Sequence, residues 1–294
     1  MRGHLKHTKE PIVGFGFLSF ENFKKLVDNN YYIEIIELSH CGEIFLNPEL
    51  IDIIKYAYSK NITLTAHNGV NFNTASDEII EALVKYKFGG ITLSLDGTSN
   101  ETYQKYRING NYDNVINNIK KLNEYKKKYN SIYPILTWQY IVFEHNKHEV
   151  QNIETIAKEL GFARYYLKED WKKEVNIHHL NTSIYRCFYD KNSEITNFFN
   201  KVQVKNCEQP WLSPQINWDG RLIGCEFAVY HDLNVNVFKL GLKKALKCDK
   251  LKYMKKVLMG KETADFTIPC NGCPFYETMK EKNNFINPKK LRFN

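Results

Sequence analysis

The fold is decided by a repeating unit that is clearest in the stretch ITLSLDGTSNETYQKYR, residues 91–107. The run Ile91–Leu95 is short and apolar, which indicates a buried strand. It ends at Asp96 and Gly97, and the next four residues, TSNE, have the pattern of a helix capping box. The stretch therefore predicts a strand, a polar loop and a helix, in that order.

The same unit recurs about five times before residue 170. Each apolar run is followed by a polar loop and then by a helical pattern, with Ser19 and Ser76 placed as helix N-caps. Such alternation makes a parallel sheet with helices outside, either a barrel or an open doubly wound sheet. The expected strands are 33–38, 62–66, 91–95, 135–143 and 163–168.

Polar residues gather where these strands end. Gly42 and Glu43 follow the first strand, Asn68 the second and Asp96 the third, and Asn146 lies near the end of the fourth. In both architectures ligands bind at the carboxyl ends of the strands. Any one of these residues is equally well explained as a solvated loop residue, but their repetition at one rim favours a site.

Four cysteines form a second candidate site. Cys207 and Cys225 have seventeen residues between them, and Cys270 and Cys273 form a C-x-x-C pair. Four thiolates can close a tetrahedral metal site, so zinc and an iron–sulfur cluster are both candidates. The cysteines alone leave these two open, together with an unliganded structural role.

Composition limits the remaining functions. The chain has 294 residues, seven cysteines and a formal net charge of +8. It contains no apolar run of the ~18 residues that a membrane span needs. The odd cysteine number and dispersed spacing do not suit a disulfide scaffold, so we expect a cytoplasmic protein. The late lysines are read as a solvated helix face rather than a nucleic-acid surface, because aromatic residues are not interleaved among them.

Together these motifs resemble the radical S-adenosylmethionine (SAM) superfamily, specifically members with a C-terminal SPASM or twitch auxiliary-cluster domain. The stretch CGEIFLNP, residues 41–48, is similar to the family's GGEPLLNP loop. Asn68 and Gly69 resemble its TNG motif. SLDG at 94–97, with Arg107, resembles its S-[IL]-D-G…R stretch. The resemblance covers nearly the whole chain.

The resemblance implies a partial (β/α)6-type TIM-like barrel lacking strand 1, plus a small C-terminal β-hairpin/helix iron–sulfur domain. It implies a partial barrel over residues 1–170, a connection with one helix over 171–206 and an auxiliary domain over 207–294. By the same resemblance, Cys207, Cys225, Cys270 and Cys273 would hold an auxiliary [4Fe–4S] cluster.

It also implies roles for six residues in binding SAM. Gly42 and Glu43 would receive the methionine amino group, and Ser94 would bond the ribose or the carboxylate end. Arg107 would pair with the carboxylate, for which a guanidinium is well suited. Asn68 and Asp96 are further candidates.

The chain departs from the family in one respect. The defining motif C-x-x-x-C-x-x-C, whose three thiolates leave one iron of a cluster open, does not occur in the sequence. As written, the chain is not expected to start radicals. We expect an N-terminal truncation, such as a misassigned start codon, with genuine degeneration as the rival explanation.

Three functions follow as hypotheses. The first is an oxidoreductase or a peptide- or small-molecule-modifying enzyme, with a flavodoxin or ferredoxin as possible electron donor. The second is a non-catalytic, degenerate iron–sulfur or SAM-binding scaffold. The third is an α/β-barrel protein with a structural zinc. The substrate and the catalytic residues are not identified by the sequence.

Overall fold

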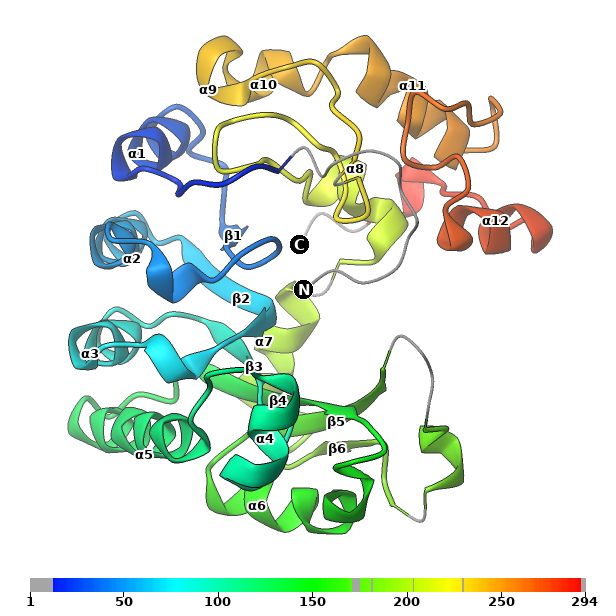
Figure 1. Ribbon diagram of the computed structural model, residues 1–294. Helices are drawn as coiled ribbons and strands as arrows, with labels where there is room; N and C mark the ends of the chain where they lie inside the picture. The colour runs from blue at the N-terminus through cyan, green and yellow to red at the C-terminus, as the bar shows by residue number, and fades with distance from the viewer. Residues whose placement is uncertain (1–12, 171–174, 181, 203, 229, 292–294) are drawn as a thin grey trace. The chain divides into compact units, whose positions relative to one another are not determined.

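The computed structural model describes residues 13–170, 175–180, 182–202, 204–228 and 230–291. The chain divides into two compact units (Figure 1). Among the described residues, the first unit comprises 32–200, and the second comprises 13–31 together with 201–291.

The first unit is built on one six-stranded sheet whose strands lie side by side in chain order. The first five strands are parallel, and β6 pairs with β5 in the antiparallel direction. The predicted α/β class is confirmed, and the mostly parallel sheet is that of a partial TIM-like barrel. The strands are β1 (Ile35–Glu37), β2 (Thr63–Val70), β3 (Gly90–Ser94), β4 (Ile135–Val142), β5 (Arg164–Glu169) and β6 (Tyr185–Cys187).

Strand β6 was not predicted, because the stretch 171–206 was expected to be a connection with one helix. The strand has only three residues, and all three are exposed. It therefore lacks the apolar alternation by which a half-buried strand is found in a sequence.

Helices connect the first five strands, and three of them begin at a residue whose side chain caps the helix; Ser76 is the cap that the sequence predicts, whereas the capping box at 98–101 is replaced by a cap at Ser99. The side chains of Ser76, Ser99 and Asn111 each accept a hydrogen bond from the backbone N–H three residues later. Asn47 accepts a hydrogen bond from the N–H of Glu49, and the next helix starts after Glu49. The helices are α2 (Leu50–Ser59), α3 (Asp77–Lys85), α4 (Asn100–Tyr106), α5 (Tyr112–Lys128), α6 (Ile153–Glu159) and α7 (Glu194–Val202).

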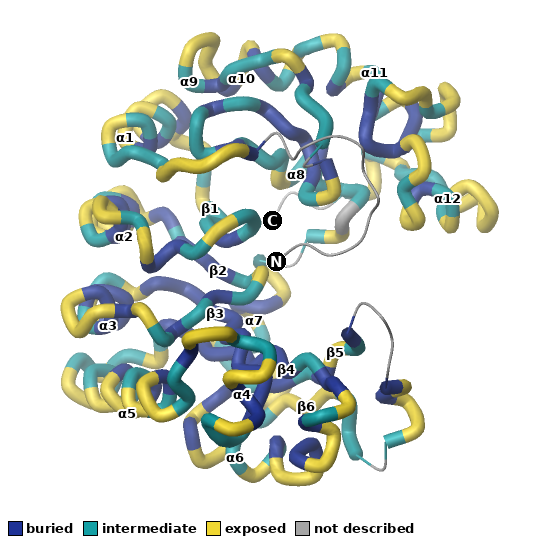
Figure 2. The backbone as a smooth tube through the Cα atoms, in the orientation of Figure 1, coloured by how far each residue is buried: buried dark blue, intermediate teal, exposed yellow. Residues whose placement is uncertain are grey.

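The two faces of the sheet differ in chemistry. One face carries buried apolar side chains such as Leu64, Leu93 and Trp138, and helices α2, α3 and α5 run along the outside of the sheet (Figures 1 and 2). The strand positions between them carry polar side chains instead, because successive residues point to opposite faces. Buried residues at these alternate positions are Thr65, Thr92, Ser94, Thr137 and Gln139.

Helix α7 covers the polar face at the amino end of β3. A Cβ added to Gly90 would lie 2.7 Å from Nε2 of His67 and 2.9 Å from the ring of Phe198. Glycine is therefore needed for the close packing of α7 on the strand. The predicted site residues lie toward the opposite, carboxyl ends of the strands.

The second unit contains short helices around an irregular hairpin. Two antiparallel bridges, Ile216 to Leu222 and Arg221 to Asn236, flank a turn at Gly220. Gly220 has φ +88°, and a Cβ there would lie 2.5 Å from the ring of Phe238. The helices are α1 (Phe20–Asp28), α8 (Gln209–Leu212), α9 (Val237–Leu240), α10 (Leu242–Ala245), α11 (Asp249–Leu258) and α12 (Pro274–Glu281).

The early segment of this unit is fastened to the hairpin. The carbonyl oxygen of Val13 accepts hydrogen bonds from Trp218 Nε1 at 2.7 Å and from Asn217 Nδ2 at 3.1 Å. Helix α1 begins soon after, with Ser19 as its N-cap as predicted. The 3₁₀ helices of the chain are Ile44–Leu46, Phe72–Thr74, Lys147–Asn152, Ile177–His179, Asn206–Glu208 and Pro288–Lys290.

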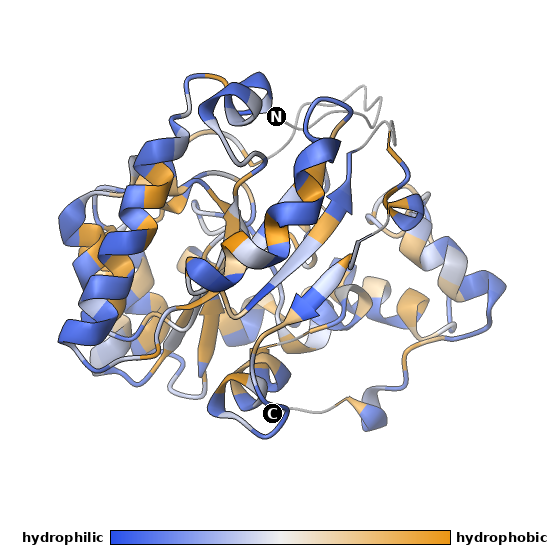
Figure 3. Cartoon of the chain, turned by 90° about the horizontal axis from the view of Figure 1, so that it is seen from below, coloured by the Kyte–Doolittle hydropathy of each residue, from blue (hydrophilic) through white to orange (hydrophobic). Residues whose placement is uncertain are grey.

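In the longer helices, apolar residues form a stripe along one side and polar residues cover the other side (Figure 3). No helix in the described part of the chain combines the length and the apolar character needed to cross a lipid bilayer.

Candidate functional site

The carboxyl end of β1 and the adjoining part of β2 share a partly buried carboxylate. Glu37 accepts hydrogen bonds from the hydroxyls of Ser39 (2.6 Å) and Thr65 (2.7 Å) and from the backbone N–H of His67 (2.9 Å). Burial nevertheless raises the pKa of Glu37 above its usual value. These bonds fix the chain as it leaves the sheet toward the loop that carries Glu43.

His67 lies beside this carboxylate, with its Nδ1 3.5 Å from Glu37 Oε2. Its Nε2 is buried without a hydrogen-bond partner among the described residues. Burial, helped by the positive charge of Arg164, lowers the pKa of His67 to about 4. The imidazole is therefore neutral at physiological pH.

Glu43 joins the loops that follow β1 and β2. Its carboxylate accepts from the backbone N–H of Asn71 at 2.6 Å and from that of Phe45 at 3.2 Å. Burial raises the pKa of Glu43, and the Arg107 charge partly opposes this. Gly42, immediately before it, has φ +131° and open space on its Cβ side. Glu43 is thus held by backbone donors rather than by a cation.

Asn68 ties the same two loops together from the other side. Its Nδ2 donates to the carbonyl of Ser39 at 2.5 Å, and its backbone N–H donates to Ser39 Oγ at 3.0 Å. In this structure Asn68 therefore shapes the loop.

Asp96 and Arg107 form a buried ion pair after β3. The Arg107 Nε and Nη2 atoms lie 2.8 Å and 2.6 Å from one oxygen, Asp96 Oδ2, while the other oxygen accepts from the N–H of Ile141 at 2.8 Å. Asn146 donates from Nδ2 to the carbonyls of Asp96 and Ile141. Asp96 is fully buried and Arg107 remains about a quarter exposed. Asp96 therefore fixes the guanidinium at the rim of the sheet.

Ser94 belongs to a row of hydrogen bonds across three strands. Tyr166 on β5 donates to Gln139 on β4 at 2.9 Å, and Gln139 donates to Ser94 Oγ on β3 at 3.3 Å. Gly69 on β2 lies against the end of this row, since a Cβ added there would lie 2.3 Å from Ser94 Oγ. The backbone of β2 thus approaches the hydroxyl closely.

The structure brings Glu43, Asp96 and Arg107 into one electrostatic neighbourhood. All three influence Tyr103, whose pKa burial raises to about 12. Sequence reasoning identified these three but missed Tyr103, Glu37, Gln139 and Tyr166. The signal for Gln139 was present, because it is a polar residue inside the largely apolar strand β4.

The second unit brings its four candidate cysteines to one cavity. Cys225 follows the hairpin, Cys207 lies in a 3₁₀ turn, and Cys270 and Cys273 precede α12. All four line the same cavity with apolar and aromatic side chains, including Met254, Pro269, Phe227, Phe275 and Tyr276. Residues up to 66 positions apart thus supply one set of sulfur donors.

The charge balance of this cavity suits a metal group. Burial raises the pKa of Cys207 to about 11 and that of Cys225 to about 12, and the neighbouring thiols add to both shifts. The same causes raise the pKa of Cys270. Thiolates here need positive charge to offset their burial, and bound metal supplies it. The four sulfurs therefore fit a thiolate-ligated group.

Two kinds of metal group take four cysteine ligands. Among the described residues, no three His, Cys, Asp or Glu side chains stand close enough to hold a metal ion. Four thiolates can hold either zinc, at about 2.3 Å from each sulfur, or an iron–sulfur cluster.

Comparison with protein families matches residues 10–164 to the radical SAM superfamily. This stretch is more than half of the 294 residues and includes every predicted SAM-contact residue of the first unit. No curated protein matches the sequence.

Solved structures share the fold at low identity. SuiB of Streptococcus suis bound to S-adenosylmethionine aligns with 97% of this chain and 73% of its own, at 12% identity and a TM-score of 0.57. In another SuiB structure the alignment covers 79% of this chain and 60% of SuiB, at 13% identity and a TM-score of 0.54. This chain therefore spans less than two thirds of the length of that relative. The alignment with anSMEcpe with bound AdoMet covers 89% of this chain and 76% of anSMEcpe, at 14% identity and a TM-score of 0.53.

Proposed function

This chain belongs to the radical SAM superfamily, and from that premise we propose that it is a SPASM-type iron–sulfur protein. In this proposal the second unit holds an auxiliary [4Fe–4S] cluster through Cys207, Cys225, Cys270 and Cys273. The observation that carries the proposal is that these four cysteines line one cavity. A cluster with four thiolate ligands stores or passes an electron when bound.

The first unit would bind SAM at the carboxyl edge of its sheet. Arg107 is held by Asp96 at this rim and keeps about a quarter of its side chain exposed. A guanidinium so placed suits the carboxylate of an amino acid. Glu43 offers a carboxylate to the amino group, and Ser94 offers a hydroxyl near the close approach of Gly69. Asn68 and Gly42 would shape the loop around the ligand.

A polypeptide of the printed sequence would bind SAM without cleaving it. Cleavage needs an electron from a cluster with an open iron, and four thiolates on the auxiliary cluster leave no iron open. The sequence has no C-x-x-x-C-x-x-C motif to build a second cluster.

The substrate class we propose is a peptide or a small molecule. SuiB is known in a crystal structure with the precursor peptide SuiA, and anSMEcpe in one with the Cp18Cys peptide. The electron donor would be a flavodoxin or a ferredoxin. Two alternatives remain to be tested: a degenerate scaffold that binds SAM or a cluster without catalysis, and an α/β-barrel protein with structural zinc.

The auxiliary cluster can be tested by spectroscopy on anaerobically reconstituted protein. We expect broad absorption near ~400 nm that bleaches on reduction, with the paramagnetic signal of a reduced [4Fe–4S] cluster. Cys225→Ala should abolish both, since it removes a buried ligand. Cys248→Ala is the matched control, because Cys248 lies outside the cavity. Equal spectra from the two variants would refute the assignment.

SAM binding is tested separately by equilibrium dialysis. Wild-type protein should bind SAM, and Arg107→Met should weaken binding about tenfold or more, because it removes a charged hydrogen-bond donor. Arg186→Met is the control, since Arg186 lies on β6 away from the rim residues. Unchanged affinity in Arg107→Met would exclude this residue from the SAM site.

A further inference from the structure

The first unit contains a cavity that neither the proposed SAM site nor the cysteine site uses. Its volume is about 330 Å³, which is within the size range of small-molecule sites. It lies between the end of α5, the start of β5 and the start of α7. The lining includes Lys126, Ile132, Lys158, Phe162, Phe188 and Ile195.

Lys126 is the unusual member of this lining. Its neighbours on α5 are paired with carboxylates: Lys121 with Asp77 at 2.9 Å and Lys128 with Glu81 at 2.8 Å. Lys126 has no carboxylate within ion-pair distance in the described part of the chain. Burial lowers its pKa to about 8, with no negative charge to oppose the effect. Most Lys126 side chains are still protonated near pH 7, so the cavity contains an uncompensated positive charge.

The second amine of the cavity already has a carboxylate partner. Lys158 Nζ lies 2.8 Å from Glu154 Oε1 and 5.2 Å from the centre of the Phe188 ring. Glu154 also accepts from Arg186 Nε at 3.2 Å. Of the two amines in the lining, Lys126 is therefore the one without a carboxylate partner among the described residues.

Apart from the two lysines and Tyr189, the side chains that line the cavity are apolar. Phe162 is 3% exposed and stacks on Trp138 with ring centres 5.4 Å apart, so its position is fixed by the core. Ile132 and Ile195 add aliphatic surface to the same cavity. A bound molecule would gain from placing an apolar body against these side chains.

We propose that this cavity is a binding site for an apolar monocarboxylate, with its carboxylate at Lys126 and its aliphatic or aromatic body against Phe162, Phe188 and Ile195. One negative charge matches the one ammonium of the lining that has no carboxylate partner among the described residues, and the apolar side chains match the body of such a molecule. The site lies near the amino ends of β4 and β5, whereas the rim residues of the proposed SAM site follow the carboxyl ends of the strands.

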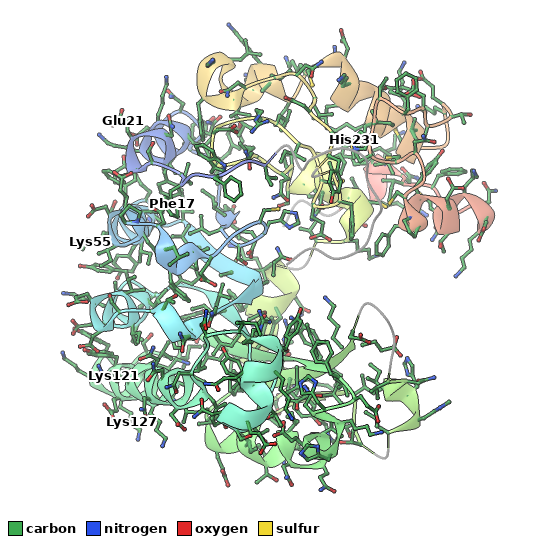
Figure 4. All side chains as sticks on the ribbon, in the orientation of Figure 1. Phe17, Glu21, Lys55, Lys121, Lys127 and His231 are labelled. Carbon is green, nitrogen blue, oxygen red and sulfur yellow. The ribbon has the colours of Figure 1, made fainter. Side chains whose placement is uncertain are left out.

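Octanoate binding to the full chain tests this proposal by calorimetry. We expect saturable binding of octanoate below about 10 mM and at least tenfold weaker binding of neutral octanol. Lys126→Met should weaken octanoate binding about tenfold or more. Lys127→Met is the matched control, because Lys127 is the next residue of α5 and is exposed on its solvent side (Figure 4). Equal octanoate affinity in both variants would overturn the proposal.

A second measurement needs no variant. Trinitrobenzenesulfonate modifies neutral lysine amines, and the modified positions are read by mass spectrometry. Octanoate should protect Lys126 from modification and leave Lys127 unaffected. Modification of Lys126 at the same rate with and without saturating octanoate would refute the site, even if Lys126→Met failed to fold.

Discussion

At the scale of single residues, the polar face of the sheet depends on groups whose charge is set by burial. His67 is the clearest case, since its pKa is lowered to about 4 while Glu37 lies 3.5 Å away. The folded protein therefore keeps His67 neutral where the unfolded chain would protonate it.

This imbalance predicts a pH-dependent stability. Between about pH 6.5 and pH 4 the unfolded chain binds a proton at His67 that the folded chain does not. The contribution of His67 to the free energy of unfolding is at its full value above about pH 6.5. It falls by up to about 3 kcal/mol as the pH drops to 4. His67→Gln should lose this part of the dependence, measured as the wild-type-minus-variant difference in urea unfolding. A difference of opposite sign would show that His67 is charged and paired with Glu37.

The Asp96–Arg107 pair gives a second prediction at this scale. Asp96→Asn leaves the guanidinium without its counter-charge while keeping the shape of the side chain. We expect a loss of about 3 kcal/mol in the free energy of unfolding. Asp113→Asn is the control, since Asp113 is at the exposed start of α5. A loss below about 0.5 kcal/mol would mean that the pair contributes nothing to the fold.

At the scale of elements, the approach of β2 to β3 shapes the rim. Gly69 has φ +88°, and a Cβ on it would lie 2.3 Å from Ser94 Oγ. Gly69→Ala should therefore destabilise the protein by about 2 kcal/mol through backbone strain and overlap. In Gly69→Ala/Ser94→Ala the overlap is relieved and the strain stays, so the double variant should be less destabilised than the sum of the single ones. Strict additivity in thermal unfolding would contradict this geometry.

The strands and helices differ in how well the sequence predicts them. The five parallel strands were predictable because each contains an apolar run and the first four are followed by a helical pattern, and the caps Ser19 and Ser76 are where the sequence places them. Strand β6 was not, because its three exposed residues carry no pattern. The positions of the rim residues follow from the topology of the sheet. The pairing of Arg107 with Asp96 does not, because it depends on side-chain conformations that the residue spacing does not determine.

At the scale of the whole molecule, charge is distributed unevenly along the chain. Residues 201–294 contain 17 Lys and Arg against 9 Asp and Glu, a net charge of +8, which equals that of the full chain. Residues 1–200 are therefore neutral overall. The segment with the four cysteines is thus the one suited to an acidic partner.

This asymmetry predicts salt-dependent electron transfer. Reduction of the reconstituted protein by an acidic flavodoxin should slow at least tenfold when the salt rises from about 0.02 to 0.5 M, because screening weakens the long-range attraction. Photoreduction by a neutral deazaflavin serves as the control and should change little. A flavodoxin rate that does not depend on salt would show that the basic segment plays no part in the encounter.

We propose that four cysteines of the second unit hold an iron–sulfur cluster, and elemental analysis of the purified protein measures this. Protein purified without oxygen should contain about four irons and four acid-labile sulfides per chain. One zinc per chain, without iron or sulfide, would contradict the account.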